Sequence, residues 1–180
     1  YLLVTGCLGQ RYADELFAEL TEVDAIVGKD SFTDIGIVID EVMAGKRLVH
    51  LEKGAPLTNQ PRMLTTPNYM AYLKIAEGCD NCCSYCAIPQ ICGPYTSRPY
   101  EEVIAEAKEL AAGGIKEIIV VAQDTTRYGE DLYGKLMLPQ LLKDLNELDG
   151  VEWIRVMYLY PNNFNDELIE AFATLDKVCK

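Results

Sequence analysis

Three cysteines on one short segment carry the clearest chemical signal in the sequence. Cys79 and Cys83 are separated by three residues, and Cys83 and Cys86 by two. Three thiolates on one loop can bind three irons of a four-iron, four-sulfur (4Fe–4S) cluster and leave the fourth iron open. A small molecule can bind an open iron and take an electron from it. The aromatic Tyr85 directly precedes the third cysteine, and the pattern predicts an iron–sulfur site that does chemistry.

Zinc is the alternative metal for the same cysteine ligands. Cys82 completes two Cys-x-x-Cys pairs, Cys79 with Cys82 and Cys83 with Cys86. Paired zinc ligands usually lie well apart in sequence, so that four sulfurs can form a tetrahedron, whereas these two pairs abut. Cys92 is a second candidate for a fourth ligand. Disulfides are disfavoured, because nothing resembles a signal peptide and clustered cysteines in an enzyme-like sequence more often bind metal or react.

Composition and charge restrict the class of protein. Hydrophobic residues make up 49% of the 180 residues and charged residues 24%, as in ordinary globular proteins. No apolar run reaches the roughly 18 residues of a membrane span. The net charge of −12 opposes attraction to nucleic acid and is compatible with a basic protein partner, although solubility alone also explains it. We therefore expect no membrane segment and no strong nucleic-acid binding.

Residues that interrupt helices and strands, chiefly glycine and proline, divide the chain into three parts. Residues 1–51 alternate strand and helix, with helices expected at 10–20 and 35–43, and this order favours a parallel sheet. Residues 52–68 contain three prolines and several turn-forming residues, which indicates a linker. Residues 69–180 resume the strand–helix alternation. Neither end of the chain reads as a natural end, so we expect the sequence to be an excerpt of a longer protein.

The third part is expected to form successive strand–helix units. A strand at 70–76 leads straight into the cysteine loop, and the β-branched run 118–122 is typical of a parallel strand covered on both faces. Three such units predict part of a barrel, in which chemistry sits on loops at the carboxyl ends of the strands. The other expected elements are a helix from Pro99 to Gly113, a helix from Pro139 to Gly150, a strand at 151–159 and a helix capped by Asn165 that runs to about Leu175.

This topology gathers three segments at one rim. The cysteine loop, the Gln123-Asp124-Thr125-Thr126 segment and residues 158–160 each follow a predicted strand. Since the carboxyl ends of parallel strands lie at the same edge, we expect these segments to meet there. Turn residues without a further role are the plainer interpretation of 123–126 taken alone.

Several segments together resemble a known family. Residues 78–89, 93–99 and 121–129 are similar to the radical S-adenosylmethionine (SAM) methylthiotransferases, and residues 4–12 resemble the end of that family's amino-terminal domain. The resemblance covers essentially the whole chain. It implies the carboxyl-terminal part of a parallel α/β methylthiotransferase domain, followed by the first half of a radical SAM (β/α) partial TIM barrel.

The resemblance also implies cofactors and their ligands. Cys79, Cys83 and Cys86 would hold the radical SAM cluster, and reduction of SAM bound to it would give a 5′-deoxyadenosyl radical. Tyr85 would pack on the adenine of SAM. Gln123 and Asp124 lie where the superfamily binds the methionine amino group, and Arg155 either reaches the SAM carboxylate or pairs with an acid.

A second 4Fe–4S cluster is implied for the amino-terminal domain. Cys7 matches the last of its three cysteine ligands, and its position between a strand and a helix suits a thiolate. A buried structural cysteine is the alternative. At Cys92 the sequence departs from the family pattern, which has Ile-Arg-Gly where this chain has Ile91-Cys92-Gly93. This exchange of a basic residue for a thiol puts normal activity in question.

The resemblance extends to the substrate. Relatives that modify an adenosine of transfer RNA typically have Gln-Asn-Val-Asn where this chain has Gln123-Asp124-Thr125-Thr126. The difference favours the branch that adds a methylthio group to the β-carbon of an aspartate in small-subunit ribosomal protein twelve. Such an enzyme is cytoplasmic and needs an electron donor. An iron–sulfur electron carrier and a zinc-stabilised interaction module are the alternatives from other classes.

Overall fold

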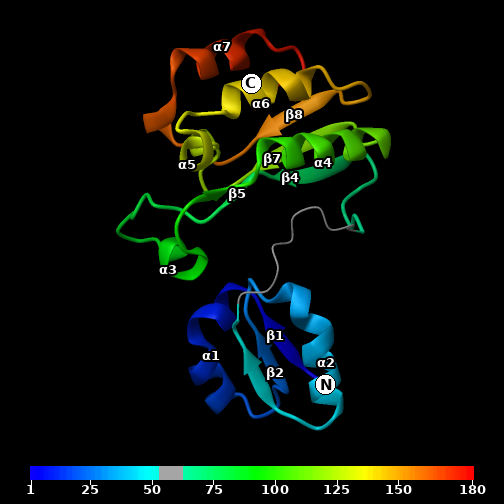
Figure 1. Ribbon diagram of the computed structural model, residues 1–180, viewed down its shortest axis with the longest axis vertical. Helices are drawn as coiled ribbons and strands as arrows, with labels where there is room; N and C mark the ends of the chain where they lie inside the picture. The colour runs from blue at the N-terminus through cyan, green and yellow to red at the C-terminus, as the bar shows by residue number, and fades with distance from the viewer. Residues whose placement is uncertain (53–62) are drawn as a thin grey trace. The chain divides into compact units, whose positions relative to one another are not determined.

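The chain folds into two compact units (Figure 1), and each is described by itself. The computed structural model describes residues 1–52 and 63–180. Of the described residues, the first unit contains 1–52 together with 90–92, and the second contains 63–89 and 93–180. The expected linker at 52–68 includes residues 53–62, which lie outside the described residues, so its boundaries stay a prediction.

The first unit is a parallel three-stranded sheet with a helix on each face (Figure 1). Alternate strand residues point to opposite faces, so Ile26 packs with Ala13 of the first helix, while Val27 packs with Val38 and Val42 of the second. The expected helix at 35–43 is confirmed. The strands, in sheet order, are β1 (Leu3–Thr5), β2 (Ala25–Val27) and β3 (Leu48–His50), and the helices are α1 (Cys7–Glu19) and α2 (Ile35–Met43), preceded by η1 (Phe32–Asp34).

The second unit is built on another parallel sheet, β4-β7-β8. An isolated parallel bridge between Ile154 and Val178 continues the sheet beyond β8. Strand–helix alternation with parallel pairing confirms the expected mixed α/β class. The elements are β4 (Met70–Lys74), α4 (Tyr100–Ala112), β7 (Glu117–Val121), α6 (Leu138–Asn146), β8 (Trp153–Val156) and α7 (Asp166–Thr174).

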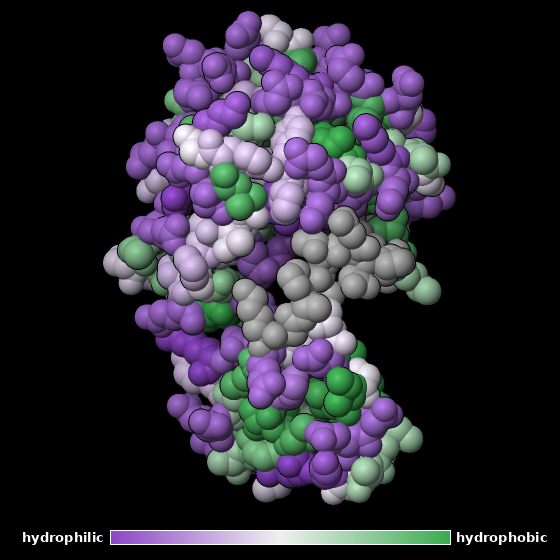
Figure 2. Space-filling model, viewed as in Figure 1, coloured by the Kyte–Doolittle hydropathy of each residue, from purple (hydrophilic) through white to green (hydrophobic). Residues whose placement is uncertain are grey.

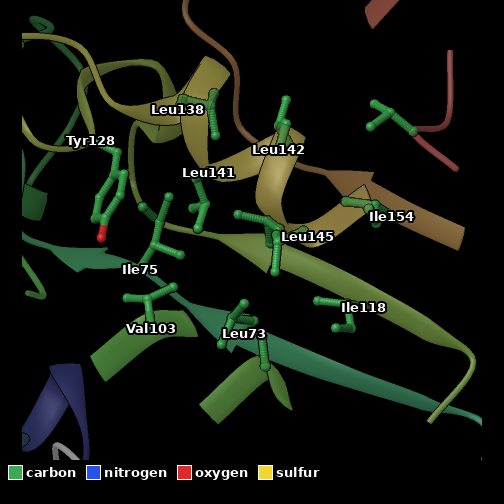
Figure 3. Packing of buried hydrophobic residues seen from close by; sticks show 14 of the residues in the cluster. Leu73, Ile75, Val103, Ile118, Tyr128, Leu138, Leu141, Leu142, Leu145 and Ile154 are labelled. Carbon is green, nitrogen blue, oxygen red and sulfur yellow. The ribbon is translucent and has the colours of Figure 1, made fainter. Parts of the chain in front are cut away.

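One face of this sheet and its helices enclose the core of the second unit. Figure 3 shows Leu141 and Leu145 of α6 directed toward Leu73 of β4 and Ile118 of β7, all fully buried. Buried leucines at spacings of three and four residues form one stripe along α6, as expected for an amphipathic helix. Alternate residues of β4 point to the other face of the sheet, where Lys74 is exposed. The carboxyl-terminal part of β4 is therefore buried on one face and exposed on the other.

Short helices and strands lie in the loops at the carboxyl-terminal edge of this sheet. The chain leaves β4 at Ile75, whose amide donates to Val121 at 3.0 Å, and then forms a two-residue antiparallel pair with a later segment. The elements are β5 (Ala76–Glu77) paired with β6 (Thr96–Ser97), α3 (Ile88–Cys92), η2 (Thr125–Arg127), α5 (Glu130–Tyr133) and η3 (Pro161–Asn163).

The structure corrects several expected boundaries. The strand expected at 70–76 is two strands in two sheets, because the chain turns away at Ile75. The strand expected at 151–159 is only β8, and the helix expected to end at Gly150 ends at Asn146. The first helix starts at Cys7 rather than at residue 10. The predicted cap is confirmed, since the Asn165 side chain accepts from the Leu168 amide at 2.9 Å.

No helix in the described part of the chain is both long and apolar enough to cross a membrane. Hydrophilic residues cover most of the visible face of the second unit (Figure 2). This distribution agrees with an apolar core enclosed between the sheet and its helices.

Replacing Leu141 by Ala tests the core. The side chain is fully buried, so its truncation leaves a cavity and should lower the free energy of unfolding by about 2–5 kcal/mol. Urea denaturation followed by the fluorescence of Trp153, the single tryptophan of the sequence, measures the change. Leu132→Ala on α5, where the side chain is exposed, is the control and should change it by only about 0.5 kcal/mol or less. Equal effects of the two substitutions would contradict the packing described.

Candidate active site

The cysteine loop follows β5 and is tightly packed at its start. Gly78 has φ +77°, and a Cβ atom there would lie 2.1 Å from the carbonyl oxygen of Pro94, so a side chain does not fit. The Cys79 amide donates to the Gly93 carbonyl at 3.2 Å, and the Cys86 amide donates to the Cys83 carbonyl at 2.9 Å. These bonds fix the backbone on both sides of the loop.

The four cysteines of the loop differ in exposure. Cys79, Cys83 and Cys86 are half-buried, whereas Cys82 is exposed, and no disulfide involves any of them. Within residues 1–52 and 63–180, no three His, Cys, Asp or Glu side chains are grouped so as to hold a single metal ion. A 4Fe–4S cluster is larger than an ion and takes one thiolate at each of several irons. The predicted ligand set therefore stays a prediction.

Hydrogen bonds join the three rim segments, as the topology predicted. Asn81 of the cysteine loop donates to the carboxylate of Asp124 at 2.9 Å. Thr125, one residue further on, donates from its amide to the carbonyl oxygen of Tyr158 at 3.1 Å, and from its hydroxyl to that of Met157 at 2.9 Å. The loops after β5, β7 and β8 are thus connected at one edge of the sheet.

Tyr95 and Arg127 add a polar layer beside Asp124. The Tyr95 hydroxyl donates to the backbone carbonyl of Asp124 at 2.8 Å. Burial, reinforced by the carboxylates of Asp124 and Asp131, raises the pKa of Tyr95 well above its usual value, so Tyr95 stays a neutral donor. A hydrogen bond to Glu130 is the main cause that raises the pKa of Arg127, which keeps its charge and pairs with Asp80 at 3.2 Å.

A cavity of about 420 Å³ opens at the same edge. Gln123 contributes a buried oxygen, Oε1, that has no hydrogen-bond partner among the described residues. A buried acceptor of this kind is costly unless a donor reaches it. Lys74 adds the end of β4 to the lining, and its ammonium group pairs with Glu77 at 2.9 Å. The cavity is lined by Lys74, Ala76, Ile88, Val121, Ala122, Gln123 and Tyr158.

Two strained backbone positions flank this region. Cys82 has φ 47° and Tyr158 has φ 61°, and they are the non-glycine residues with positive φ in the described part of the chain. Such conformations are uncommon for L-residues and persist only where the surroundings hold them. One lies in the cysteine loop and the other lines the cavity, so both belong to the rim segments.

The remaining predicted residues have different surroundings. Tyr85 is 90% exposed. Arg155, on β8, donates to Glu117 at 2.8 Å, and this hydrogen bond is the main cause that raises its pKa. The structure therefore shows the pairing with an acid that was one of its two expected roles. Cys7 is exposed and is the first residue of α1 in the first unit.

Sequence reasoning missed Asn81, Lys74 and Tyr95. Asn81 lies between two predicted ligands, and its short amide side chain was a signal for a hydrogen bond within or near the loop. Lys74 is the last residue of β4, where a polar side chain faces the rim. Nothing local in the sequence marked Tyr95, because its partner, Asp124, lies 29 residues further along the chain.

Comparison with known proteins identifies the second unit. Residues 73–178 match the Radical SAM superfamily, and this match includes the cysteine loop, the cavity and the sheet from the end of β4 onward. The chain belongs to the radical SAM superfamily. The resemblance of the cysteine spacing to this superfamily is thereby confirmed, and membership favours an enzyme over an electron carrier or a zinc-stabilised module.

Curated relatives match the chain over almost its whole length. A ribosomal protein uS12 methylthiotransferase RimO from Thermoanaerobacter sp. (strain X514) is 48% identical and aligns with 100% of this chain and 42% of its own length. Proteins of the same name from Clostridioides difficile (strain 630) and from Caldanaerobacter subterraneus subsp. tengcongensis are 50% and 54% identical, covering 99% and 97% of this chain. The chain spans about two fifths of the length of these relatives.

The radical SAM site suits the cofactors of the superfamily, SAM and a 4Fe–4S cluster. Cys79, Cys83 and Cys86 supply three thiols, which as thiolates are the usual ligands of such clusters. Gln123 lines the cavity, and its buried Oε1 is an acceptor with no hydrogen-bond partner among the described residues. The donor set and the cavity are therefore compatible with both groups.

Alanine substitutions test the ligand set of the radical SAM cluster. Cys79→Ala, Cys83→Ala and Cys86→Ala should each abolish the visible absorption gained on anaerobic reconstitution of the 180-residue chain, because two thiolates do not retain the cluster. Cys82→Ala is the matched control and should keep about four irons per chain. Iron and sulfide analysis gives the count. A cluster that survives Cys83→Ala but is lost in Cys82→Ala would contradict the assignment.

Proposed function

We propose that the whole protein to which this chain belongs is a radical SAM methylthiotransferase. In this proposal it adds a methylthio group to the β-carbon of an aspartate in small-subunit ribosomal protein uS12. The observation that carries the proposal is the identity of about one half, over 97–100% of the chain, to relatives named ribosomal protein uS12 methylthiotransferase. The cysteine loop and the adjoining cavity support it with the residues that such chemistry needs.

The cysteine loop binds the radical SAM cluster in this proposal. Cys79, Cys83 and Cys86 each give one thiolate, and Cys82 points its exposed thiol elsewhere. When bound, the cluster and SAM supply an electron and a radical able to remove hydrogen from an unactivated carbon. The protein's task is to bind these groups, orient them and keep water from the reacting atoms.

The cavity orients SAM. Gln123 Oε1 accepts from the amino group, which gives a buried acceptor the partner that it otherwise lacks. The ammonium group of Lys74 is half-exposed and can exchange Glu77 for a carboxylate in the cavity, because exposed ion pairs contribute little. Tyr85 is free to cover the adenine. Asp124 and Arg155 already have protein partners, and their contact with SAM stays a prediction.

The first unit takes part through Cys7. We assign Cys7 as one ligand of a second cluster that provides the sulfur to be transferred. Cys7 is exposed and is the first residue of α1, so its thiol is accessible to a cluster. One thiolate does not hold a 4Fe–4S cluster, so other cysteines must complete the set. Cys92, at the end of α3, is the residue whose identity departs from the family pattern.

Charge supports a protein substrate over a nucleic acid. The net charge of −12 suits a basic ribosomal protein and opposes attraction to a phosphate backbone. A tRNA-modifying methylthiotransferase is the second candidate. We also place the protein in the cytoplasm with its substrate and with an electron donor.

Deletion of the gene tests the substrate. The methylthio group on the uS12 aspartate should disappear from the mass spectrum of the ribosomal protein, and the methylthiolated nucleosides of the tRNA pool should be unchanged. Complementation with the Cys82→Ala gene should restore the modification, whereas the Cys83→Ala gene should not.

The opposite result would reject the substrate. If methylthio-adenosine vanishes from tRNA on deletion while the uS12 peptide keeps its mass, the protein is a tRNA-modifying enzyme. Membership of the radical SAM superfamily would be unaffected.

A further inference from the structure

A side-chain hydrogen bond connects the cysteine loop to the loop after β7. Asn81 lies between Cys79 and Cys83, and its Nδ2 donates to Oδ2 of Asp124 at 2.9 Å. A carboxylate only accepts, so the amide nitrogen is the atom that faces it. Asp124 is 1% exposed. The middle of the cysteine loop is thereby joined to a buried charge 43 residues away.

The other oxygen of Asp124 already has partners. Oδ1 accepts from the amide of Thr126 at 3.1 Å and from the Thr126 hydroxyl, which caps η2. Among the described residues, Asn81 is the donor that reaches Oδ2. Loss of that donor leaves the buried Oδ2 of Asp124 without a hydrogen-bond partner. The free-energy penalty of such a buried, unsatisfied oxygen is larger than the net contribution of the hydrogen bond.

A second set of contacts holds the same loop through Asp80. Asp80 accepts from the Tyr95 amide at 3.1 Å and from Arg127 at 3.2 Å. The Arg127 guanidinium lies 5.3 Å from the centre of the Tyr95 ring, whose hydroxyl donates to the Asp124 carbonyl. The Asp80 side chain is 45% exposed, so this pair contributes orientation more than stability.

The loop needs this support because its backbone is strained. Cys82, directly after Asn81, has φ 47°, a conformation that non-glycine residues rarely adopt. Strained positions persist when surrounding contacts over-determine them. Asn81 is the neighbour whose partly buried side chain bonds to the buried Asp124.

We propose that the hydrogen bond between Asn81 and Asp124 holds the cysteine loop in the conformation that accepts the cluster, which makes Asn81 and Asp124 positioning residues. The bond also reaches the cavity, since Gln123 directly precedes Asp124 and lines it. Cluster loading and SAM binding therefore depend on the same bond. This inference rests on the proposed function only in assigning the three thiols to a cluster.

A swap of the two side chains tests the proposal in the whole protein. Asn81→Asp sets two carboxylates against each other, and Asp124→Asn sets two amides together. The double variant Asn81→Asp/Asp124→Asn restores one donor and one acceptor, and the amide oxygen that it introduces in the loop after β7 can still accept from Thr126. On α6, Gln140 donates to Asp144 at 2.8 Å at an exposed position, so Gln140→Glu is the matched control.

Two readouts separate positioning from general stability. The rate of cluster incorporation is followed by visible absorption, and SAM affinity by the change that SAM makes in the electron paramagnetic resonance signal of the reduced cluster. Each single variant should lose about tenfold or more in both, as expected for a bond to a buried charge. The swap should recover most of the loss, and Gln140→Glu should match the wild type.

Circular dichroism shows whether each variant folds, so that a loss of folding is not mistaken for a loss of loop positioning. If Asn81→Asp does not fold, Asn81→Ala, which adds no charge, takes its place and should load slowly. Folded single variants that load and bind SAM like the wild type would overturn the proposal, as would a folded swap variant no better than either single variant. A wild-type protein that binds no iron on the cysteine loop would instead reject the proposed function.

Discussion

Parallel pairing of β4, β7 and β8 is the constraint on which the site depends. Residues Lys74 and Val121 are paired in register, as are Val120 and Val156, so the three strands end at nearly the same level. Each strand returns through a helix packed on one face, and each therefore releases its next loop at the same edge. The cysteine loop, the segment after β7 and the segment after β8 meet there because parallel strands all end at the same edge of the sheet.

The core determines how rigid that edge is. Leu73 of β4 and Ile118 of β7 pack against α6, so the strand ends are fixed by burial of apolar side chains. The polar rim then adds specific order: a buried carboxylate, Asp124, collects donors from its own turn and from the cysteine loop. Burial makes these hydrogen bonds stronger and makes their loss costly. The cysteine loop is thus joined to a buried carboxylate through Asn81.

Local patterns in the sequence predicted those features that depend on interactions between residues close in sequence. The helix at 35–43 and the Asn165 cap follow from apolar periodicity and from a short polar side chain before a helix. Cysteine spacing indicated the site, and the superfamily match confirmed its class. The strand break at Ile75 was not predictable, because an apolar β-branched residue continues the strand pattern while the turn depends on pairing with residues 96–97. Nor was the bond from Asn81 to Asp124, which depends on the folded sheet.

Amide hydrogen exchange in the protein before iron is added tests the central claim, that the protein's own contacts shape the cysteine loop. The amides of Cys79 and Tyr95 donate to Gly93 and Asp80, and that of Cys86 donates to Cys83. All three should exchange well below free-chain rates without the cluster. Exchange at free-chain rates until the cluster is loaded would show that the cluster, and not the protein, orders the loop.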